Sequence, residues 1–114
     1  VGTVPERVTR YLSGASIIIC ESNHDEIRTR TGVPYEGGRW RPLWVLRQHS
    51  LGPKGHLSNE SAGEALARLV TRDTNAVVLC HVSEDYNRPD IANNTVARRN
   101  GAIENTRCSC RKGR

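Results

Sequence analysis

Two short apolar runs constrain the fold more than any other feature of this sequence. They are ASIIIC at residues 15–20 and AVVLC at residues 76–80. Their apolar residues are continuous rather than alternating, and β-branched residues dominate them, a pattern typical of strands that are covered on both faces. The sequence therefore predicts two buried strands that lie far apart along the chain.

Helical patterns surround these strands. The clearest one follows Ser58, a favoured helix-capping residue. Its apolar residues recur at the spacing of one amphipathic face, namely Ala62, Ala65, Leu66, Leu69 and Val70. A last helix is predicted from Pro89, with its inward residues at Ile91, Ala92, Thr95 and Val96.

Two further helices are predicted in the first half of the chain. Thr3 is placed to cap a helix that begins near Pro5 and ends at Gly14. Its apolar face is formed by Val4, Val8, Tyr11 and Leu12. Another helix is predicted from near Pro42, burying Leu43, Val45 and Leu46.

The alternation of helices and strands predicts an α/β (α+β) domain in which helices cover a sheet. At 114 residues the chain forms one domain at most. Its hydrophobic content is 36%, with no Phe or Met, which is low for a self-sufficient core. We therefore expect the apolar clusters to pack against a partner outside this chain, as in a fragment.

Targeting and redox signals are few. No apolar run approaches the roughly 18–20 residues that a membrane span needs, and no signal peptide opens the chain, so a cytoplasmic protein is expected. Cys20 and Cys80 end the two strand-like runs, where reduced, structural thiols are expected. Cys108 and Cys110 lack the spacing of a zinc knuckle and receive no role.

The formal net charge of +5 is concentrated in one segment. Between residues 28 and 54 six basic residues face one acid, and Trp40 and Trp44 lie among them. Such a segment suits nucleic acid, because Lys and Arg displace phosphate counterions and an indole stacks on a base. The alternative is a solvated loop with both tryptophans in the core. The basic residues are Arg28, Arg30, Arg39, Arg41, Arg47 and Lys54.

Titratable groups follow both strands, where α/β sheets bind ligands. Glu21, His24 and Asp25 follow the first strand within ESNHD, and His81 follows the second. His56 in GHLSN precedes the clearest helix, whose N-terminus can hold an anion such as phosphate. Imidazole and carboxylate donors together suit zinc or manganese.

Each of these residues also has a purely structural interpretation. Glu21 could pair with an arginine, His56 could bond to a backbone carbonyl in a turn, and His81 could be a satisfied core histidine. His49 has no motif around it and is interpreted as a surface residue. The spacing contains no HxH or HExxH pattern, so spacing alone leaves these alternatives open.

Three segments taken together resemble a known family. ESNHD, GHLSN and VVLCHVSEDYN, in this order, resemble the C-terminal half of metallo-β-lactamase-fold hydrolases. Within that family they are most similar to a bacterial branch of nucleases encoded near two-component cell-wall regulators. The resemblance covers residues 1–100 and leaves residues 101–114 as a basic tail, which is expected to be frayed.

The resemblance implies a fold, cofactors and roles for residues. The fold is a four-layered αββα sandwich that holds two divalent metal ions, zinc or manganese, and hydrolyses phosphodiesters. His81 matches the last metal-ligating histidine, and His56 a histidine that helps to protonate the leaving oxygen. Glu21 then orients His56. The remaining residues are assigned to substrate binding at the rim of the site: His24, Asp25, Ser58 and Asn59.

In this family the other ligands lie in an HxHxDH motif of the N-terminal half, which this chain lacks. We therefore expect the complete protein to be a metal-dependent nuclease acting on DNA or RNA, and the isolated chain to be inactive. Two alternatives stay open: hydrolysis of a small ester, amide or thioester, and a non-catalytic nucleic-acid-binding module. The metal, the mode of cleavage and the oligomeric state do not follow from the sequence.

Overall fold

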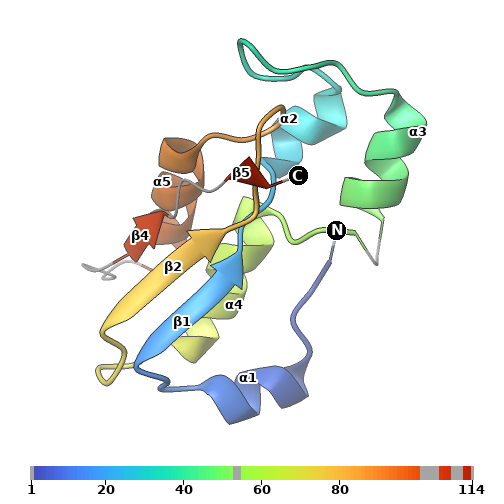
Figure 1. Cartoon of the computed structure of the whole chain (residues 1–114). Coiled ribbons are helices and arrows are strands. Elements are labelled where there is room, and N and C mark those ends of the chain that lie inside the picture. Colours follow the sequence, from blue (N-terminus) through green and yellow to red (C-terminus); the bar gives the residue numbers. More distant parts are fainter. Residues whose placement is uncertain (1, 53–54, 101–105, 109–111, 114) are drawn as a thin grey trace.

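The computed structural model describes residues 2–52, 55–100, 106–108 and 112–113. Helices and strands alternate along the chain, as predicted (Figure 1). The helices are α1 (Glu6–Leu12), α2 (Glu26–Thr31), α3 (Leu43–Leu46), the π-helical turn η1 (Arg47–Leu51), α4 (Asn59–Leu69) and α5 (Pro89–Asn100). The strands are β1 (Ile17–Glu21), β2 (Ala76–Cys80), β3 (Val82–Ser83), β4 (Thr106–Cys108) and β5 (Lys112–Gly113).

The two predicted strands are neighbours in one parallel sheet. β1 pairs with β2 so that Ile18 lies opposite Val77 and Glu21 opposite Cys80. β4 extends this sheet on the far side of β2, giving the order β1-β2-β4. Because all three strands are parallel, their carboxyl ends lie at one edge.

The C-terminal tail differs from the prediction. We expected a frayed segment, but residues 106–108 form β4, and residues 112–113 form β5, which pairs with β3. A strand of two or three residues is stabilised by pairing with a strand already in place, so it leaves little periodic signal in its own sequence. The predicted domain boundary near residue 100 stays a prediction.

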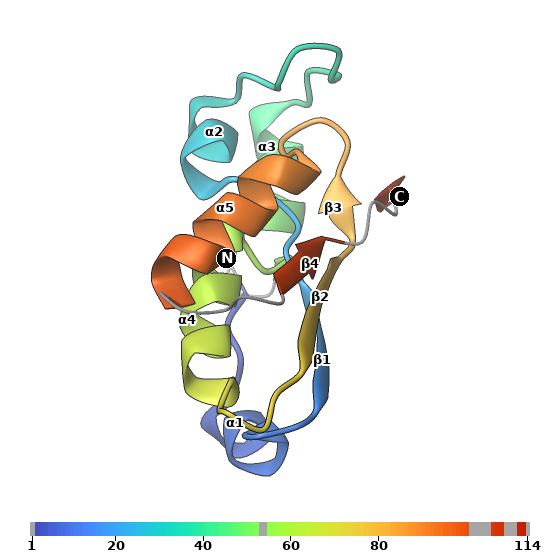
Figure 2. The ribbon, with the colours of Figure 1, turned by 90° about the vertical axis from the view of Figure 1, so that its left-hand side faces the viewer.

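Helices α4 and α5 cover one face of the sheet and enclose the core (Figure 2). The Ser58 hydroxyl accepts a hydrogen bond from the Ser61 N–H, which confirms the predicted cap of α4. Both helices bury the faces predicted for them, except that Val70 and Ile91 are half-buried. The buried cluster consists of Ile18, Leu57, Ala62, Leu66, Leu69, Val77, Leu79, Ala92 and Val96.

The other face of β1 is open, contrary to the prediction of strands covered on both faces. Ile17 and Ile19 are 62% and 70% exposed, whereas Ile18 between them is 5% exposed. Among the described residues the helices lie on the α4 and α5 side of the sheet (Figure 2). Alternate residues of a strand point to opposite faces, so one covered face needs an apolar residue only at every second position. The continuous apolar run of β1 therefore also places apolar side chains on its open face.

The N-terminal helix forms at the predicted place but does not bury its apolar face. Pro5, not Thr3, is the N-cap residue of α1, and no side chain caps this end. No residue of α1 is buried, and Tyr11 is 84% exposed. The helix lies against α4 beyond the amino end of β1 (Figure 1), where the sheet no longer offers an apolar surface.

The segment between β1 and α4 contains one helix that the sequence reading missed. α2 begins after Asp25, whose carboxylate accepts the Arg28 N–H, and ends at Gly32, which adopts a left-handed φ of 76°.

In α3 only part of the prediction holds, because Leu46 is buried but Leu43 is 47% exposed. The helix spans a single turn before η1 begins, so it has room for one buried position.

The structure thus confirms a mixed α/β fold. None of the described helices is long and apolar enough to cross a membrane.

The burial pattern of β1 and β2 predicts unequal effects of truncating their apolar residues. Leu79→Ala should lower the free energy of unfolding by about 2–5 kcal/mol, because Leu79 is completely buried and its loss leaves a cavity. Ile19→Ala, the matched change on the open face, should cost less than about 1 kcal/mol. Urea unfolding of both variants of the isolated 114-residue chain measures the difference. Equal costs in this chain would contradict the exposed position of Ile19.

Candidate active site

The predicted site residues converge where the parallel strands end. Glu21 is the last residue of β1, and His81 directly follows β2. His81 is the only described non-glycine residue with a positive φ, at 56°, a conformation that turns the chain sharply as it leaves the sheet. His56 lies in the segment that leads into α4, close to the same edge.

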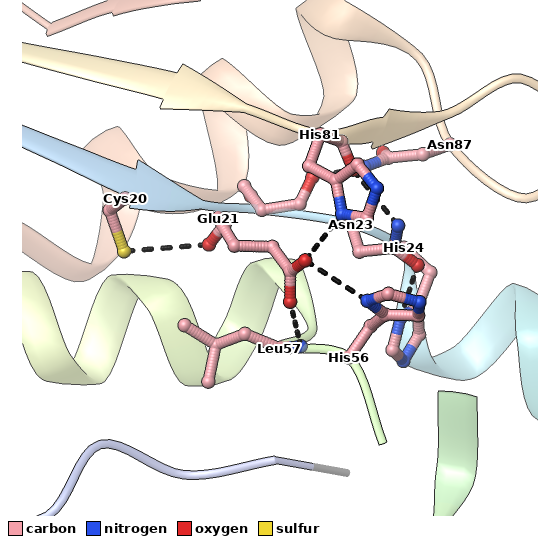
Figure 3. Close-up of polar contacts among 9 residues, drawn as sticks. Cys20, Glu21, Asn23, His24, His56, Leu57, His81 and Asn87 are labelled. Carbon is pink, nitrogen blue, oxygen red and sulfur yellow. Dashed lines mark hydrogen bonds and ion pairs between the residues drawn. The ribbon is translucent and has the colours of Figure 1, made fainter. Parts of the chain in front are cut away.

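The Glu21 carboxylate lies between two imidazoles (Figure 3). Its Oε2 atom is 3.0 Å from His56 Nδ1 and 2.5 Å from His81 Nδ1. Its Oε1 atom accepts the Leu57 N–H at 2.6 Å. The two rings meet edge to face, with 4.9 Å between their centroids. One carboxylate therefore joins the end of β1, the end of β2 and the segment before α4.

Electrostatics keep this carboxylate ionised. Burial by itself raises the pKa of Glu21, but hydrogen bonds from His81, the Leu57 N–H and His56 outweigh it, so the pKa lies below its ordinary value. An ionised carboxylate only accepts hydrogen bonds, so each imidazole carries its proton on Nδ1. The Nε2 atoms of both rings are thereby left as the atoms that can bind a metal or a substrate.

Among the described residues, Glu21, His56 and His81 form the one group that could hold a metal ion, with ligand atoms within 4.8 Å of one another. Two imidazoles and a carboxylate are a donor set that zinc accepts. An imidazole whose Nδ1–H is fixed by a carboxylate is also the usual form of a metal-ligating histidine. The residues present therefore fit a divalent metal ion.

A buried amide network lies beneath this group and joins the three sequence motifs. The Ser22 hydroxyl donates to Asn59 Oδ1 at 2.6 Å, and Asn59 Nδ2 donates to Asn87 Oδ1 at 2.8 Å. Asn87 Nδ2 in turn donates to the Ser22 carbonyl at 2.9 Å. Separately, Asn23 Nδ2 donates to the His81 carbonyl, which fixes the turn after β2 (Figure 3).

Ser58 and Asn59, predicted to bind substrate, are both fully buried. Ser58 caps α4, and the amide of Asn59 belongs to the buried network. The structure therefore gives both residues contacts inside the protein, and their predicted contact with substrate stays a prediction.

His24 and Asp25, predicted at the rim, also contact the protein itself. His24 is 1% exposed, and its Nδ1–H donates to Asn23 Oδ1 at 3.2 Å. Its Nε2 atom is buried without a hydrogen-bond partner in the described structure. Asp25 caps α2 and accepts the Tyr35 hydroxyl at 2.7 Å. Their predicted role in substrate binding stays a prediction, although His24 offers almost no surface for it.

Two members of the candidate metal-binding group, His56 and His81, line a cleft of about 400 Å³. Part of the basic segment lines the same cleft, through Arg39 and Arg41. Trp40 and Trp44 are 69% and 67% exposed, which rules out the alternative that they belong to the core. The cleft is lined by Asn23, Arg39, Arg41, Val45, Leu46, His49, Ser50, His56, His81, Ser83, Glu84, Asp85 and Tyr86. Lys54 lies outside the described residues.

His49 was missed by the sequence reading, which placed it on the surface without a role. It is exposed but lines the cleft, and its carbonyl accepts the His56 N–H at 3.0 Å. No pattern in the sequence marks it, because its position depends on how η1 folds back toward His56. Asp85 and Tyr86 also line the cleft, and only their place in the third motif hinted at this.

The strand cysteines are free thiols. Burial raises the pKa of Cys20 to about 12, and burial followed by the charge of Glu21 raises that of Cys80. Both are therefore protonated at neutral pH and poor ligands or nucleophiles. The side chains of Cys108 and Cys110 lie outside the described structure.

The fold and site define a mixed α/β protein with a candidate metal site at a cleft that two arginines line. The chain is similar to exodeoxyribonuclease YycJ of Bacillus anthracis, with 32% identity over 96 residues that cover 84% of this chain and 33% of that protein. It is also similar to exodeoxyribonuclease WalJ of Streptococcus pneumoniae, with 32% identity over 95 residues that cover 83% of this chain and 32% of that protein.

These relatives confirm the predicted resemblance to bacterial nucleases. The chain spans about a third of the length of the relatives that it matches. No protein-family model and no solved structure matches the chain.

The burial of His24 predicts a pH dependence of stability. Burial, aided by the nearby His56, lowers the pKa of His24 from 6.5 to about 4. As the pH falls below 6.5 the unfolded chain binds a proton that the folded protein refuses, so stability falls until about pH 4. At pH 5 the loss should be roughly 2 kcal/mol.

Urea unfolding at pH 7.5 and pH 5 measures this loss. His24→Gln should remove most of it, because glutamine does not titrate. His49→Gln, a matched change at an exposed histidine, should keep the wild-type pH dependence. An identical pH dependence in all three proteins would contradict the prediction.

Proposed function

We propose that this chain forms part of the active site of a metal-dependent nuclease that hydrolyses phosphodiester bonds of DNA. The observation that carries the proposal is the Glu21 carboxylate, hydrogen-bonded to His56 and His81 at a cleft that Arg39 and Arg41 also line. The names of the relatives, exodeoxyribonucleases, support DNA as the substrate and its ends as the place of cleavage.

In this proposal His81 binds a metal ion through its Nε2 atom. The complete site holds two divalent ions, zinc or manganese, which when bound would activate water and neutralise charge on the phosphate. A catalytic zinc normally has three protein ligands, so two ions need more donors than the described residues offer. We propose that the further ligands come from residues outside this chain, in a protein as long as its relatives.

The residues of this chain then have separate tasks. Glu21 fixes the orientation and tautomer of both imidazoles by accepting their Nδ1–H groups. His56, in its protonated form, donates a proton from Nε2 to the leaving oxygen. Arg39 and Arg41 bind neighbouring phosphates, because a guanidinium matches phosphate geometry and keeps its charge at every physiological pH.

The basic side chains favour nucleic acid over a small ester, amide or thioester. A small neutral substrate gains little from arginines beside the reacting group, whereas a polyanion gains from them even though Asp85 already pairs with Arg41. Because Arg39 and Arg41 line the same cleft as His56 and His81, a phosphate bound at the imidazoles would bring its neighbours close to these arginines. This position also argues against a binding module with no use for the imidazoles.

We further propose that the whole protein has the four-layered αββα sandwich of metallo-β-lactamase-fold hydrolases. The open apolar face of β1, with Ile17 and Ile19 exposed, supports this fold, because a second sheet would cover it there. In such a sandwich each sheet carries helices on its outer face and packs its inner face against the other sheet. The sheet of this chain, with its helices, would form one of these two halves.

Substitutions at the carboxylate and at one imidazole test this function. In the full-length protein with manganese, Glu21→Gln should lower the rate of DNA cleavage about 10- to 100-fold, because a neutral amide fixes the imidazoles poorly. His81→Ala should lower both cleavage and the amount of bound metal. The matched control is Glu64→Gln, at an exposed carboxylate that pairs with Arg99. Unchanged cleavage and metal content in both site variants would contradict the proposal.

The number of ligands gives a second prediction. The 114-residue chain alone, mixed with manganese and end-labelled DNA, should give no turnover above background, because its ligand group is incomplete. Adding the missing part of the protein in trans should restore cleavage if the two parts associate. Robust cleavage by the isolated chain would overturn the proposal that further ligands are needed.

A further inference from the structure

Two exposed indoles lie outside the core beside the candidate active site. Trp40 is 69% exposed and Trp44 is 67% exposed. Tryptophan is highly buried on average, because exposing its large ring to water costs free energy. Two such rings in one short segment are an unusual surface that typically marks a binding site.

The chain neighbours of both tryptophans line the cleft. Trp40 stands between Arg39 and Arg41, which line it, and Trp44 directly precedes Val45, which lines it too. Neither tryptophan is itself among the residues that line the cleft, so both exposed indoles extend into solvent from the segment that forms its edge. Two exposed aromatic rings therefore belong to the same short segment as two arginines that line the cleft.

This segment is held in place by contacts from the third sequence motif. Asp85 accepts the Arg39 N–H at 2.8 Å, and its other oxygen pairs with the Arg41 guanidinium at 3.0 Å. The Tyr86 hydroxyl accepts the Arg41 N–H at 3.1 Å. Gly38 allows this close approach, because a Cβ atom there would lie 2.8 Å from the Asp85 Cα atom. The backbone that carries Trp40 is therefore fixed, although its side chain is free of the core.

We propose that Trp40 and Trp44 stack on exposed nucleobases at an end of the nucleic acid, while Arg39 and Arg41 bind the adjoining phosphates. Each base presents a flat face to an indole only where it is unpaired or terminal, since inside a duplex both faces are covered by neighbouring pairs. The two tryptophans thus recognise the end of the strand. This inference rests on the proposed nuclease function and names the part of the substrate that the site holds.

Stacking explains why the arginines and indoles occur together. Arginines alone bind any phosphate backbone, and their contribution falls steeply as salt rises. Indoles add a contact that is insensitive to charge and that depends on an accessible base face. The combination selects ends over the interior of a duplex, which the arginines could not do by themselves.

The test is binding of labelled DNA to the full-length protein in a chelating buffer, so that the DNA is not cut. Three probes are compared: a 12-nucleotide single strand, a blunt-ended duplex and a closed circular duplex without ends. The double variant Trp40→Ala/Trp44→Ala should weaken binding of the probes that have ends by about 5- to 100-fold. Binding of the circle should not change.

Matched variants separate stacking from general damage to the surface. Tyr11→Ala removes another exposed aromatic residue, on α1 and away from the cleft, and should change nothing. Trp40→Phe/Trp44→Phe should retain most of the affinity for ends, since phenyl rings also stack. Arg39→Ala should weaken all three probes and reduce their salt dependence, whereas Arg72→Ala, at the opposite end of the strands, should not.

Each outcome decides the proposal. A loss of affinity that is confined to the two probes with ends supports it. Comparing the loss for the single strand with the loss for the blunt duplex shows which kind of end supplies the stacked base. An equal loss on all three probes, no loss, or no binding of ends by the wild-type protein would overturn it. Failure of the nuclease function would appear separately, as absent cleavage by the wild-type protein with manganese, and would leave the binding comparison intact.

Discussion

The parallel pairing of β1 with β2 is the constraint on which the rest of this structure depends. Its register places Glu21 beside Cys80, so that the next residue, His81, meets the Glu21 carboxylate across a separation of 60 positions in the chain. Parallel strands bring their carboxyl ends to one edge, whereas an antiparallel pair would place these residues at opposite ends. The packing of α4 and α5 on one face fixes this pairing, and the segment entering α4 then adds His56.

A layer of polar contacts lies between the apolar core and the candidate site. The amides of Asn59 and Asn87 are almost wholly buried. They form a hydrogen bond with each other, and each also forms one with Ser22. A buried amide without partners destabilises a protein by about 1–3 kcal/mol, so these groups must form together or not at all. The network therefore locks three loops into one arrangement, and the Glu21 carboxylate above it has little freedom to move.

The two surfaces of the sheet differ in a way that matters for function. One is covered by helices and carries the core, and the other exposes Ile17 and Ile19. At the carboxyl edge of the sheet the surface is polar and charged. Arg41, for example, pairs with Asp85 and still remains partly exposed in the cleft. The apolar sheet face suits protein packing, whereas the cleft presents imidazoles, arginines and carboxylates to solvent.

The sequence by itself determined the strong local features. Both strands, the capped helix after Ser58 and the helix from Pro89 were predictable because their apolar patterns agree with their local propensities. Glu21 and His81 were also indicated before any geometry was known, since they follow the two strands, and the resemblance of the three motifs added His56. The fates of other residues depended on contacts between distant segments. Burial of His24, exposure of Trp40 and the place of His49 in the cleft follow from how the segment between β1 and α4 folds over the sheet edge. No local pattern encodes such packing, so only the tertiary structure decided which side chains reach the cleft and which face of β1 stays open.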